Sequence, residues 1–186
     1  MTPETEKLNE NVLTIQHSLD GFSYVFVPAE VYEDKNKEQY LDILGVKDDN
    51  CVVCADYIPE ADVYNVYQIP QIDIKINRHP ASVLLANLIK ENQERTDDAR
   101  VYLNIKDQHF EMFVLKGDKF LFNNTFRFKT KEDFLYFMLY SMEQLHLDAG
   151  SVPVYFLGMI EEKSAITELT SRYVRDVRFK KDIKCE

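Results

Sequence analysis

The sequence predicts an α/β protein with a mixed sheet, folded as two lobes. The first observation is the order of apolar patterns from Arg100 to Lys180, which reads strand, strand, strand, helix, strand, helix, strand. The second is a polar linker, Glu91–Asp98, between two stretches that each contain strand and helix patterns. The third is the length of 186 residues, which suits one large domain or two small lobes.

The expected domain organisation follows from this linker. We expect a disordered leader at residues 1–11, an N-terminal lobe at residues 12–93 and a C-terminal lobe at residues 100–186. The leader is polar and acidic, without the basic start and apolar stretch of a signal peptide. No run approaches the roughly 20 apolar residues that span a bilayer, so the sequence predicts a cytoplasmic protein that does not enter a membrane.

In the N-terminal lobe, alternating apolar and polar residues predict strands. Asp20-Gly21 predicts a hairpin turn, because glycine reaches positive φ at little cost. Pro28 suits the first turn of a helix, and Gly45 suits a helix end. The expected strands are Val12–His17, Phe22–Val27, Cys51–Ile58, Val63–Ile69 and Ile72–Ile76, and the expected helices are Ala29–Glu33, Lys37–Leu44 and Pro80–Gln93.

The C-terminal lobe has clearer patterns. Thr130 stands three residues before Asp133 and ahead of an apolar periodic run, which predicts a helix N-cap. The helix runs to Leu145, and Phe134, Leu135, Met138, Met142 and Leu145 have the spacing of a core face. The other expected elements are strands Val101–Lys106, Phe110–Leu115, Phe120–Phe128, Val152–Leu157 and Asp176–Phe179, and a helix at Lys163–Val174.

This β-β-β-α-β-α-β order is that of the ribonuclease H-like core, which nucleases and actin-like ATPases share. The two halves also echo each other weakly. Tyr24–Pro28 followed by a helix matches Val154–Gly158 followed by a helix. Either the chain holds two related lobes, or two ordinary αβ units resemble each other by chance.

Several phrases of the sequence carry a resemblance to a known family. They are His17-Ser-Leu-Asp-Gly-Phe-Ser-Tyr24, Val27-Pro-Ala-Glu30, His79-Pro-Ala-Ser82, Phe122-Asn-Asn-Thr-Phe126 and Glu132-Asp-Phe-Leu-Tyr-Phe137. They resemble a bacterial domain-of-unknown-function family of DUF3822 type, found in Bacteroidetes-type bacteria. The resemblance implies an actin-like ATPase fold with two ribonuclease H-like lobes, and it implies no activity. One departure stands out: the opening hairpin and the Val-Pro-Ala-Glu segment run together at Ser23–Val27, which indicates a shortened N-terminal lobe.

Nucleotide chemistry on this fold would need specific turns. An actin-like ATPase holds phosphates on two hairpin turns, usually of Asp-x-Gly type, where backbone N–H groups approach the phosphate and the aspartate holds Mg²⁺. The candidates are Asp20 and Gly21 in the first lobe and Asp107 in the second, with Gly158 as the adenosine-loop candidate. The first turn lacks the spacing, the second lacks glycine, and only one glycine follows the later strand. We therefore interpret these residues as vestigial and expect no cofactor.

Other chemistries fit less well. A ribonuclease H-type nuclease would need a carboxylate on the strand Val152–Leu157, which has none, although Asp107 and Glu132 or Asp133 could serve elsewhere. Cys51-Val-Val-Cys54 is a lone CxxC within a predicted strand, which favours buried thiols over a zinc or redox site. The histidines, His17, His79, His109 and His146, form no recognisable set, and spacing alone leaves a Ser-His-Asp arrangement open. We expect no catalytic residues and no metal.

The formal net charge of −10 disfavours nucleic-acid binding, because an acidic surface repels phosphates. The C-terminal basic residues from Arg172 to Lys184 are interpreted as a solvated helix face and tail. The leading hypothesis is a non-catalytic scaffold or interaction protein with an unknown protein partner or a homodimer. The alternative is a nucleotide or small-molecule binder that has lost hydrolysis, and a weak ATPase is a more distant option.

Overall fold

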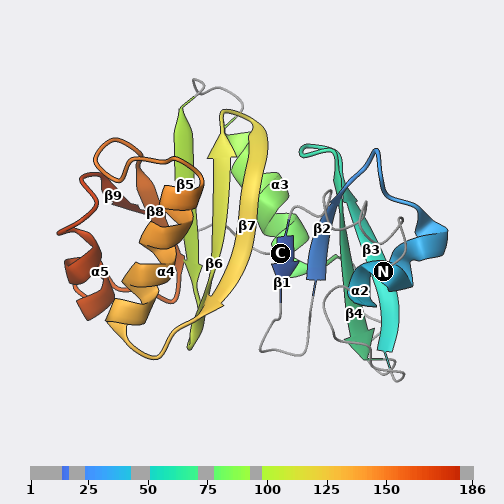
Figure 1. Cartoon of the computed structure of the whole chain (residues 1–186), viewed down its shortest axis with the longest axis horizontal. Coiled ribbons are helices and arrows are strands. Elements are labelled where there is room, and N and C mark those ends of the chain that lie inside the picture. The colour runs from blue at the N-terminus through green and yellow to red at the C-terminus, as the bar shows by residue number, and fades with distance from the viewer. Residues whose placement is uncertain (1–13, 17–23, 43–50, 71–77, 93–97, 181–186) are drawn as a thin grey trace. The chain divides into compact units, whose positions relative to one another are not determined.

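A computed structural model describes residues 14–16, 24–42, 51–70, 78–92 and 98–180. Their contacts divide the chain into two compact units (Figure 1). Unit 1 comprises the described residues through Lys90, and unit 2 comprises the described residues Glu91–Lys180. Each unit is built around its own sheet.

Unit 1 is an antiparallel sheet with two short helical segments and one longer helix. The strand order is β1-β2-β4-β3, so β3 is an outer strand of the described sheet. The bounds of its elements are β1 Thr14–Gln16, β2 Tyr24–Pro28, η1 Asp34–Asn36, α2 Lys37–Asp42, β3 Cys51–Ile58, β4 Val63–Pro70 and α3 Pro80–Asn92, whose last two residues count with unit 2.

One face of the unit 1 sheet packs against α2. This face packs Val25, Val27 and Val66 around Tyr40 of α2, whose hydroxyl donates to the carbonyl of Val31 at 3.0 Å. Four residues of β2, Tyr24, Val25, Phe26 and Val27, are fully buried. The outer strand β3 does expose Val52 and Tyr57.

A helix at Ala29–Glu33 was expected, and this prediction is wrong. Strand β2 continues through Pro28, which pairs with Val63 of β4. The next amide, that of Ala29, donates to the carbonyl of Asp62 at 2.9 Å and so extends the contact between the strands. The chain then passes through a turn before η1 begins at Asp34. Pairing with β4 therefore outweighed the preference of Pro28 for a helix start.

Unit 2 has the element order expected from the sequence. Three strands are followed by a helix, a strand, a second helix and a last strand. Their bounds are β5 Ala99–Ile105, β6 His109–Lys116, β7 Lys119–Arg127, α4 Lys131–Gln144, β8 Val154–Gly158, α5 Ala165–Thr170 and β9 Val177–Phe179.

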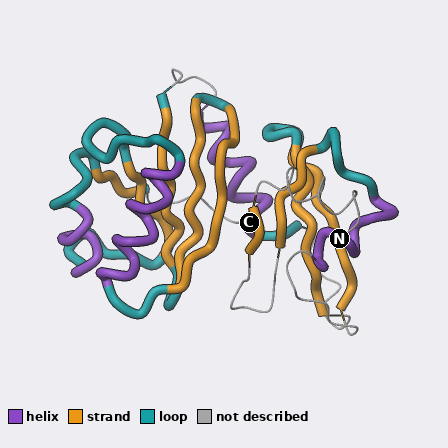
Figure 2. The backbone as a smooth tube through the Cα atoms, in the orientation of Figure 1, coloured by secondary structure: helices purple, strands orange, loops and turns teal. Residues whose placement is uncertain are grey.

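The five strands of unit 2 form one mixed sheet in the order β7-β6-β5-β8-β9. Strands β5, β6 and β7 pair antiparallel as a meander, whereas β5 with β8 and β8 with β9 pair parallel. The two parallel steps each need a crossover, and α4 and α5 supply them. Both helices lie on the same side of the sheet (Figure 2). The prediction of a mixed sheet of ribonuclease H-like order is confirmed.

The core of unit 2 lies between the sheet and α4. Phe134, Met138 and Met142 are fully or almost fully buried, and they pack with alternate residues of β5, β6 and β8. This is the helix face that the apolar spacing predicted. The helix begins as expected: Thr130 Oγ1 accepts from the amide of Asp133 at 3.1 Å, and the Asp133 carboxylate accepts from the amide of Thr130 at 3.1 Å.

Helix α5 is shorter than the expected Lys163–Val174. The helix ends at Thr170. The Thr170 hydroxyl donates to the carbonyl of Ile166, and the Ser171 hydroxyl donates to the carbonyl of Thr167. Such hydroxyls compete with the helical backbone for its carbonyls. The chain turns at Ser171, which leaves Tyr173 exposed and carries Val174 into the core.

Candidate functional site

A pocket of about 370 Å³ lies in unit 2 at the carboxyl ends of β5 and β8. Ligands of open α/β sheets usually bind at this end of the strands, which makes it the first place to look for a site. The pocket brings Asp107, on the β5–β6 turn, together with Met159, which follows Gly158. Its lining residues are Ile105, Lys106, Asp107, Phe128, Met159, Ile160, Glu161, Ser164 and Ile166.

The β5–β6 turn makes its own backbone contacts. The amide of Lys106 donates to the carbonyl of His109 at 2.9 Å, and the amide of Phe128 donates to the carbonyl of Gln108 at 3.1 Å. Neither Asp107 nor Gln108 has the positive φ that a glycine would serve. The turn is therefore a tight hairpin, and the residue after β7 braces it.

The charge of Lys106 is matched within the sheet. Its ammonium lies 3.1 Å from Oε1 of Glu111, and the amide nitrogen of Asn104 donates to Oε2 of the same carboxylate at 2.8 Å. Glu111 is only 4% exposed, so its charge needs both partners. This leaves Asp107 and Glu161 as the other charged residues of the pocket, both of them acidic.

Gly158 has a packing role at the end of β8. Its φ is +77°, and a Cβ added there would lie 2.3 Å from the carbonyl oxygen of Ile105 and 2.6 Å from Oδ1 of Asn104. The close approach lets the amide of Met159 donate to the same Ile105 carbonyl at 2.8 Å. Only glycine combines this backbone conformation with this proximity, so the join between β5 and β8 explains the glycine without a nucleotide.

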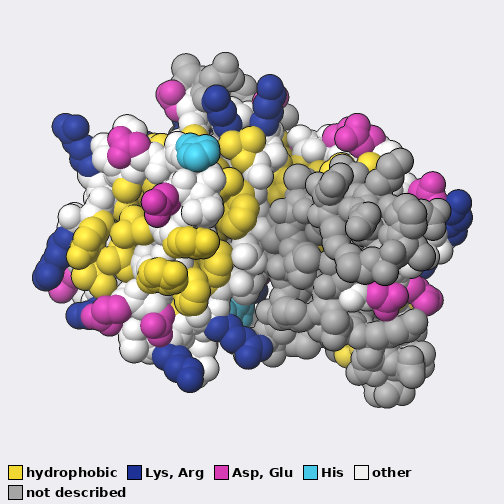
Figure 3. Space-filling view, viewed as in Figure 1, with side chains coloured by type: hydrophobic (Ala, Val, Ile, Leu, Met, Phe, Trp, Pro, Cys, Tyr) yellow, Lys and Arg dark blue, Asp and Glu magenta, His cyan; other side chains and the backbone are white. Residues whose placement is uncertain are grey.

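A second hollow of about 300 Å³ lies between α4 and α5. We call it the helix groove, and its lining residues are Glu132, Leu135, Tyr136, Leu139, Tyr140, Leu169 and Tyr173. The side chains of Tyr136, Tyr140 and Tyr173 are 61%, 49% and 56% exposed. Apolar side chains gather over this part of unit 2 in the space-filling view (Figure 3).

The helix groove was not predicted from the sequence, although part of its signal was present. Tyr136 and Tyr140 are four residues apart, and their rings stack with centroids 5.9 Å apart on α4. They alternate with the buried positions Phe134 and Met138, which marks them as exposed aromatic residues on an amphipathic helix. The contribution of Tyr173 could not be foreseen, because it depends on where α5 ends.

Asp56, His79 and Ser82 come together in unit 1, but not as a catalytic triad. The Asp56 carboxylate accepts from the amide of His79 at 2.7 Å and from the hydroxyl of Ser82 at 2.8 Å. A triad needs the serine hydroxyl to donate to the imidazole, but here it donates to Asp56, while the His79 Nδ1 accepts from the amide of Ala81. These contacts hold the start of α3 against β3, and they join Asp56 to His79, which is 23 positions later in the sequence.

The two cysteines of the CxxC lie on one strand and face opposite sides of it. Cys51 shares the side of Val53 and Ala55, which pack with the α2 cluster, whereas Cys54 shares the side of Asp56. Burial raises the pKa of the Cys54 thiol, and the charge of Asp56 raises it further. Cys54 is therefore a poor nucleophile at neutral pH. The prediction that these thiols are buried is wrong, because Cys51 and Cys54 are only half-buried.

The comparisons with known proteins place this chain in a family. Residues 19–177 match the model of a family described as "Protein of unknown function (DUF3822)". The chain belongs to the DUF3822 family. No curated protein is similar enough to this DUF3822 protein to count as a match.

Two solved structures are similar to this DUF3822 protein in fold. One is a Bacteroides thetaiotaomicron VPI-5482 protein with an actin-like ATPase fold and unknown function, with a TM-score of 0.75 and 15% identity. The match covers 90% of this chain and 67% of that one. The other is a PilM-PilN type IV pilus biogenesis complex, with a TM-score of 0.57, 11% identity, and coverage of 89% and 68%. The actin-like fold expected from the resemblance is confirmed.

Among the predicted site residues of this DUF3822 protein, Asp107 lines the pocket, whereas Gly158 is not in the lining and directly precedes the lining residue Met159. Asp20 and Gly21 lie outside the described residues, as does His17. Within the described ranges, no group of three or more His, Cys, Asp or Glu side chains is arranged to hold a metal ion. None of the described helices is long and apolar enough to cross a membrane.

Proposed function

We propose that this DUF3822 protein is a non-catalytic scaffold that binds another protein. The observation that carries the proposal is its exposed tyrosine-rich surface. Four tyrosines, Tyr57, Tyr136, Tyr140 and Tyr173, are among the exposed large apolar side chains of the described residues. Tyrosine is enriched at protein interfaces, because its ring offers a large apolar area and its hydroxyl a hydrogen bond. Three of the four line a single groove.

The pocket at the end of β5 and β8 supports the non-catalytic part of the proposal. Gly158, which precedes the lining residue Met159, is explained by strand packing, and Lys106 of the pocket is paired with Glu111. The turn that would hold a phosphate is tight: the Lys106 amide donates to the His109 carbonyl, and the Gln108 carbonyl accepts from the amide of Phe128. Asp107 and Glu161 give the pocket an acidic character that would repel phosphate. We interpret Asp107 and Gly158, with Asp20 and Gly21 in unit 1, as remnants of a nucleotide-binding fold.

One of the two similar structures supports an interaction role. It is a complex of PilM with PilN, so the fold shared with this chain occurs there within a protein assembly. Identity of 11% carries the fold and not the partner. A cytoplasmic location stays a prediction.

Site-specific photo-crosslinking in the producing bacterium tests the interaction role. A photoreactive phenylalanine analogue is placed singly at Val52, Tyr57, Tyr136, Met159 or Tyr173, all exposed positions. We expect irradiation to give a discrete heavier adduct from at least one position, because an exposed aromatic surface used for binding is covered in the cell. Mass spectrometry of the adduct distinguishes a second protein from a second copy of this chain. No adduct from any of the five positions would contradict an interaction role.

A binder of nucleotides or other small molecules is the second candidate, and one observation favours it. The pocket beside Asp107 has a volume of about 370 Å³, within the range of small-molecule sites. It mixes apolar side chains with a few polar groups, Asp107, Glu161 and Ser164, as such sites do. On this hypothesis the residues that remain from an ATPase hold a ligand without hydrolysing it.

Thermal unfolding with ATP and Mg²⁺ separates the two candidates. A ligand present at 100 times its Kd stabilises the folded protein by about 2.7 kcal/mol, which raises the melting temperature by several degrees. For a scaffold without a nucleotide site we expect no shift up to millimolar ATP, compared with Mg²⁺ alone. A clear rise that disappears in an Asp107→Ala variant would instead support the small-molecule binder and locate its site.

A further inference from the structure

The methionines of the described residues differ sharply in exposure. Met159 is 76% exposed, the highest value among the exposed large apolar side chains of the described residues. By contrast, Met112, Met138 and Met142 are at most 1% exposed and belong to the core of unit 2. A thioether in contact with solvent is open to oxidants, whereas a core thioether is reached only when the structure opens. Met1 lies outside the described residues.

The backbone around Met159 holds this side chain at the rim of the pocket beside Asp107. The amide of Met159 donates to the carbonyl of Ile105 at 2.8 Å, and the amide of Ile160 donates to the carbonyl of Gly158 at 3.0 Å. Gly158 is itself fixed by its close approach to the same Ile105 carbonyl. The exposure of Met159 is therefore a property of the folded join between β5 and β8.

The core of unit 2 does not depend on the Met159 side chain. The next residue, Ile160, packs against that core, but Met159 does not belong to it. An oxygen atom added to the sulfur of Met159 would meet water, whereas the same oxygen on Met138 would become a buried polar atom in an apolar cluster. Oxidation of Met159 therefore leaves the fold intact.

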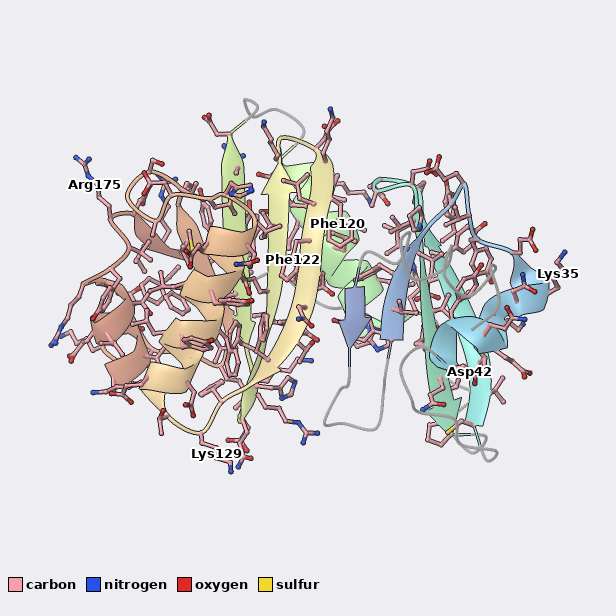
Figure 4. The ribbon with its side chains drawn as sticks, in the orientation of Figure 1. Lys35, Asp42, Phe120, Phe122, Lys129 and Arg175 are labelled. Atoms are coloured by element: carbon pink, nitrogen blue, oxygen red, sulfur yellow. The ribbon has the colours of Figure 1, made fainter. Side chains whose placement is uncertain are left out.

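The charges around the pocket favour an uncharged oxidant. Asp107 and Glu161 are acidic residues of the lining, and the ammonium of Lys106 is matched by Glu111 at 3.1 Å. Lys129 is not part of the lining and points outward at the periphery of unit 2 (Figure 4). Because negative charge beside the thioether disfavours anionic oxidants, hydrogen peroxide, which is uncharged at neutral pH, is the expected reactant.

We propose that Met159 is a site of reversible oxidation, converted by hydrogen peroxide to methionine sulfoxide at the rim of the pocket. The sulfur donates an electron pair to one peroxide oxygen, the O–O bond breaks, and the products are the sulfoxide and one water. A methionine sulfoxide reductase restores the thioether at the expense of a dithiol, which becomes a disulfide while the oxygen leaves as water. The reaction turns an apolar side chain of the rim into a polar one, whichever of the two candidate functions the protein performs.

Limited treatment of the full chain with hydrogen peroxide, followed by proteolysis and mass spectrometry, tests the proposal. We expect the peptide with Met159 to gain one oxygen about tenfold faster, or more, than the peptides with Met112, Met138 and Met142, because the core sulfurs react only after the structure opens. In urea that unfolds the chain, the four rates should become similar. The reductases for the two sulfoxide epimers, with dithiothreitol, should then remove the oxygen from Met159.

Two matched variants make the test specific, and both keep the side-chain volume nearly constant, so both should fold. Met159→Leu should abolish the fast oxygen gain, whereas Met138→Leu, which removes a buried sulfur, should leave it unchanged. The oxidised wild type should melt like the untreated protein. In ¹⁵N spectra, its changes should be confined to amides near the pocket.

Three results would overturn the proposal. The first is oxidation of Met159 at the rate of the core methionines in the folded chain. The second is an oxygen on Met159 that neither reductase removes. The third is a lowered melting temperature with spectral changes spread through α4, which would show that the reaction needs the core to open.

Discussion

Replacing Phe134 by alanine is expected to destabilise unit 2 by about 3–5 kcal/mol, the usual cost of truncating a fully buried phenylalanine. Phe134 is 0% exposed on the inner face of α4. Its ring centroid lies 4.5 Å from that of Phe110, 5.6 Å from that of Phe128 and 6.0 Å from that of Phe156. The substitution therefore leaves a cavity among three rings that come from three different strands or their ends.

Urea unfolding followed by circular dichroism measures this effect. The midpoint of the unit 2 transition should fall while the slope stays constant, because the surface exposed on unfolding changes little. Tyr136→Ala is the control on the same helix, since its side chain is 61% exposed and its loss should change stability by no more than about 0.5 kcal/mol. Equal midpoints for the Phe134 variant and the wild type would mean that α4 packs with another face.

Replacing Gly158 by alanine is expected to have the second largest effect, a destabilisation of roughly 2–5 kcal/mol. Two costs combine. The φ of +77° is strained for any residue with a Cβ, and the new methyl would lie 2.3 Å from the backbone carbonyl oxygen of Ile105. The obstacle is backbone and cannot rotate away, so β5 and β8 must separate at their carboxyl ends.

The matched control for this substitution is Gly150→Ala. A Cβ at Gly150 would lie 3.3 Å from Oδ1 of Asp148, the end of a flexible side chain, and should cost little. Thermal unfolding of both variants gives the comparison. If Gly158→Ala melted like Gly150→Ala, strand packing would not explain the glycine, and the interpretation of Gly158 as an adenosine-loop residue would gain support.

The element order of unit 2 could be predicted because each of its elements has a strong local pattern. The apolar period of α4 and the alternation in β5 and β6 are visible in windows of fewer than 15 residues. The cap at Thr130 and Asp133 is also local, since its partners are three residues apart. The family resemblance then indicated how such elements pack, and the sheet order agrees with it.

The errors fall where distant residues compete with local preference. The segment after Pro28 has a helix signal, but its backbone bonds to Asp62, more than 30 positions away. Helix α5 has an apolar period that continues past Thr170, but the chain turns there and Val174 enters the core. In both places contacts between elements outweighed propensities of a few tenths of a kcal/mol per residue.

The sequence by itself determined the fold class of this DUF3822 protein, the core face of α4 and the departure of Asp107 and Gly158 from nucleotide-binding patterns. Only the tertiary structure decided that Gly158 is required by the Ile105 carbonyl, that Asp56 fixes the start of α3, and that tyrosines from α4 and from the turn after α5 line one groove. The reason is physical. The periodicity that predicts a helix or strand lies within one short stretch of sequence, whereas a groove, or the close approach of two backbone segments, forms only when distant parts of the chain meet after folding.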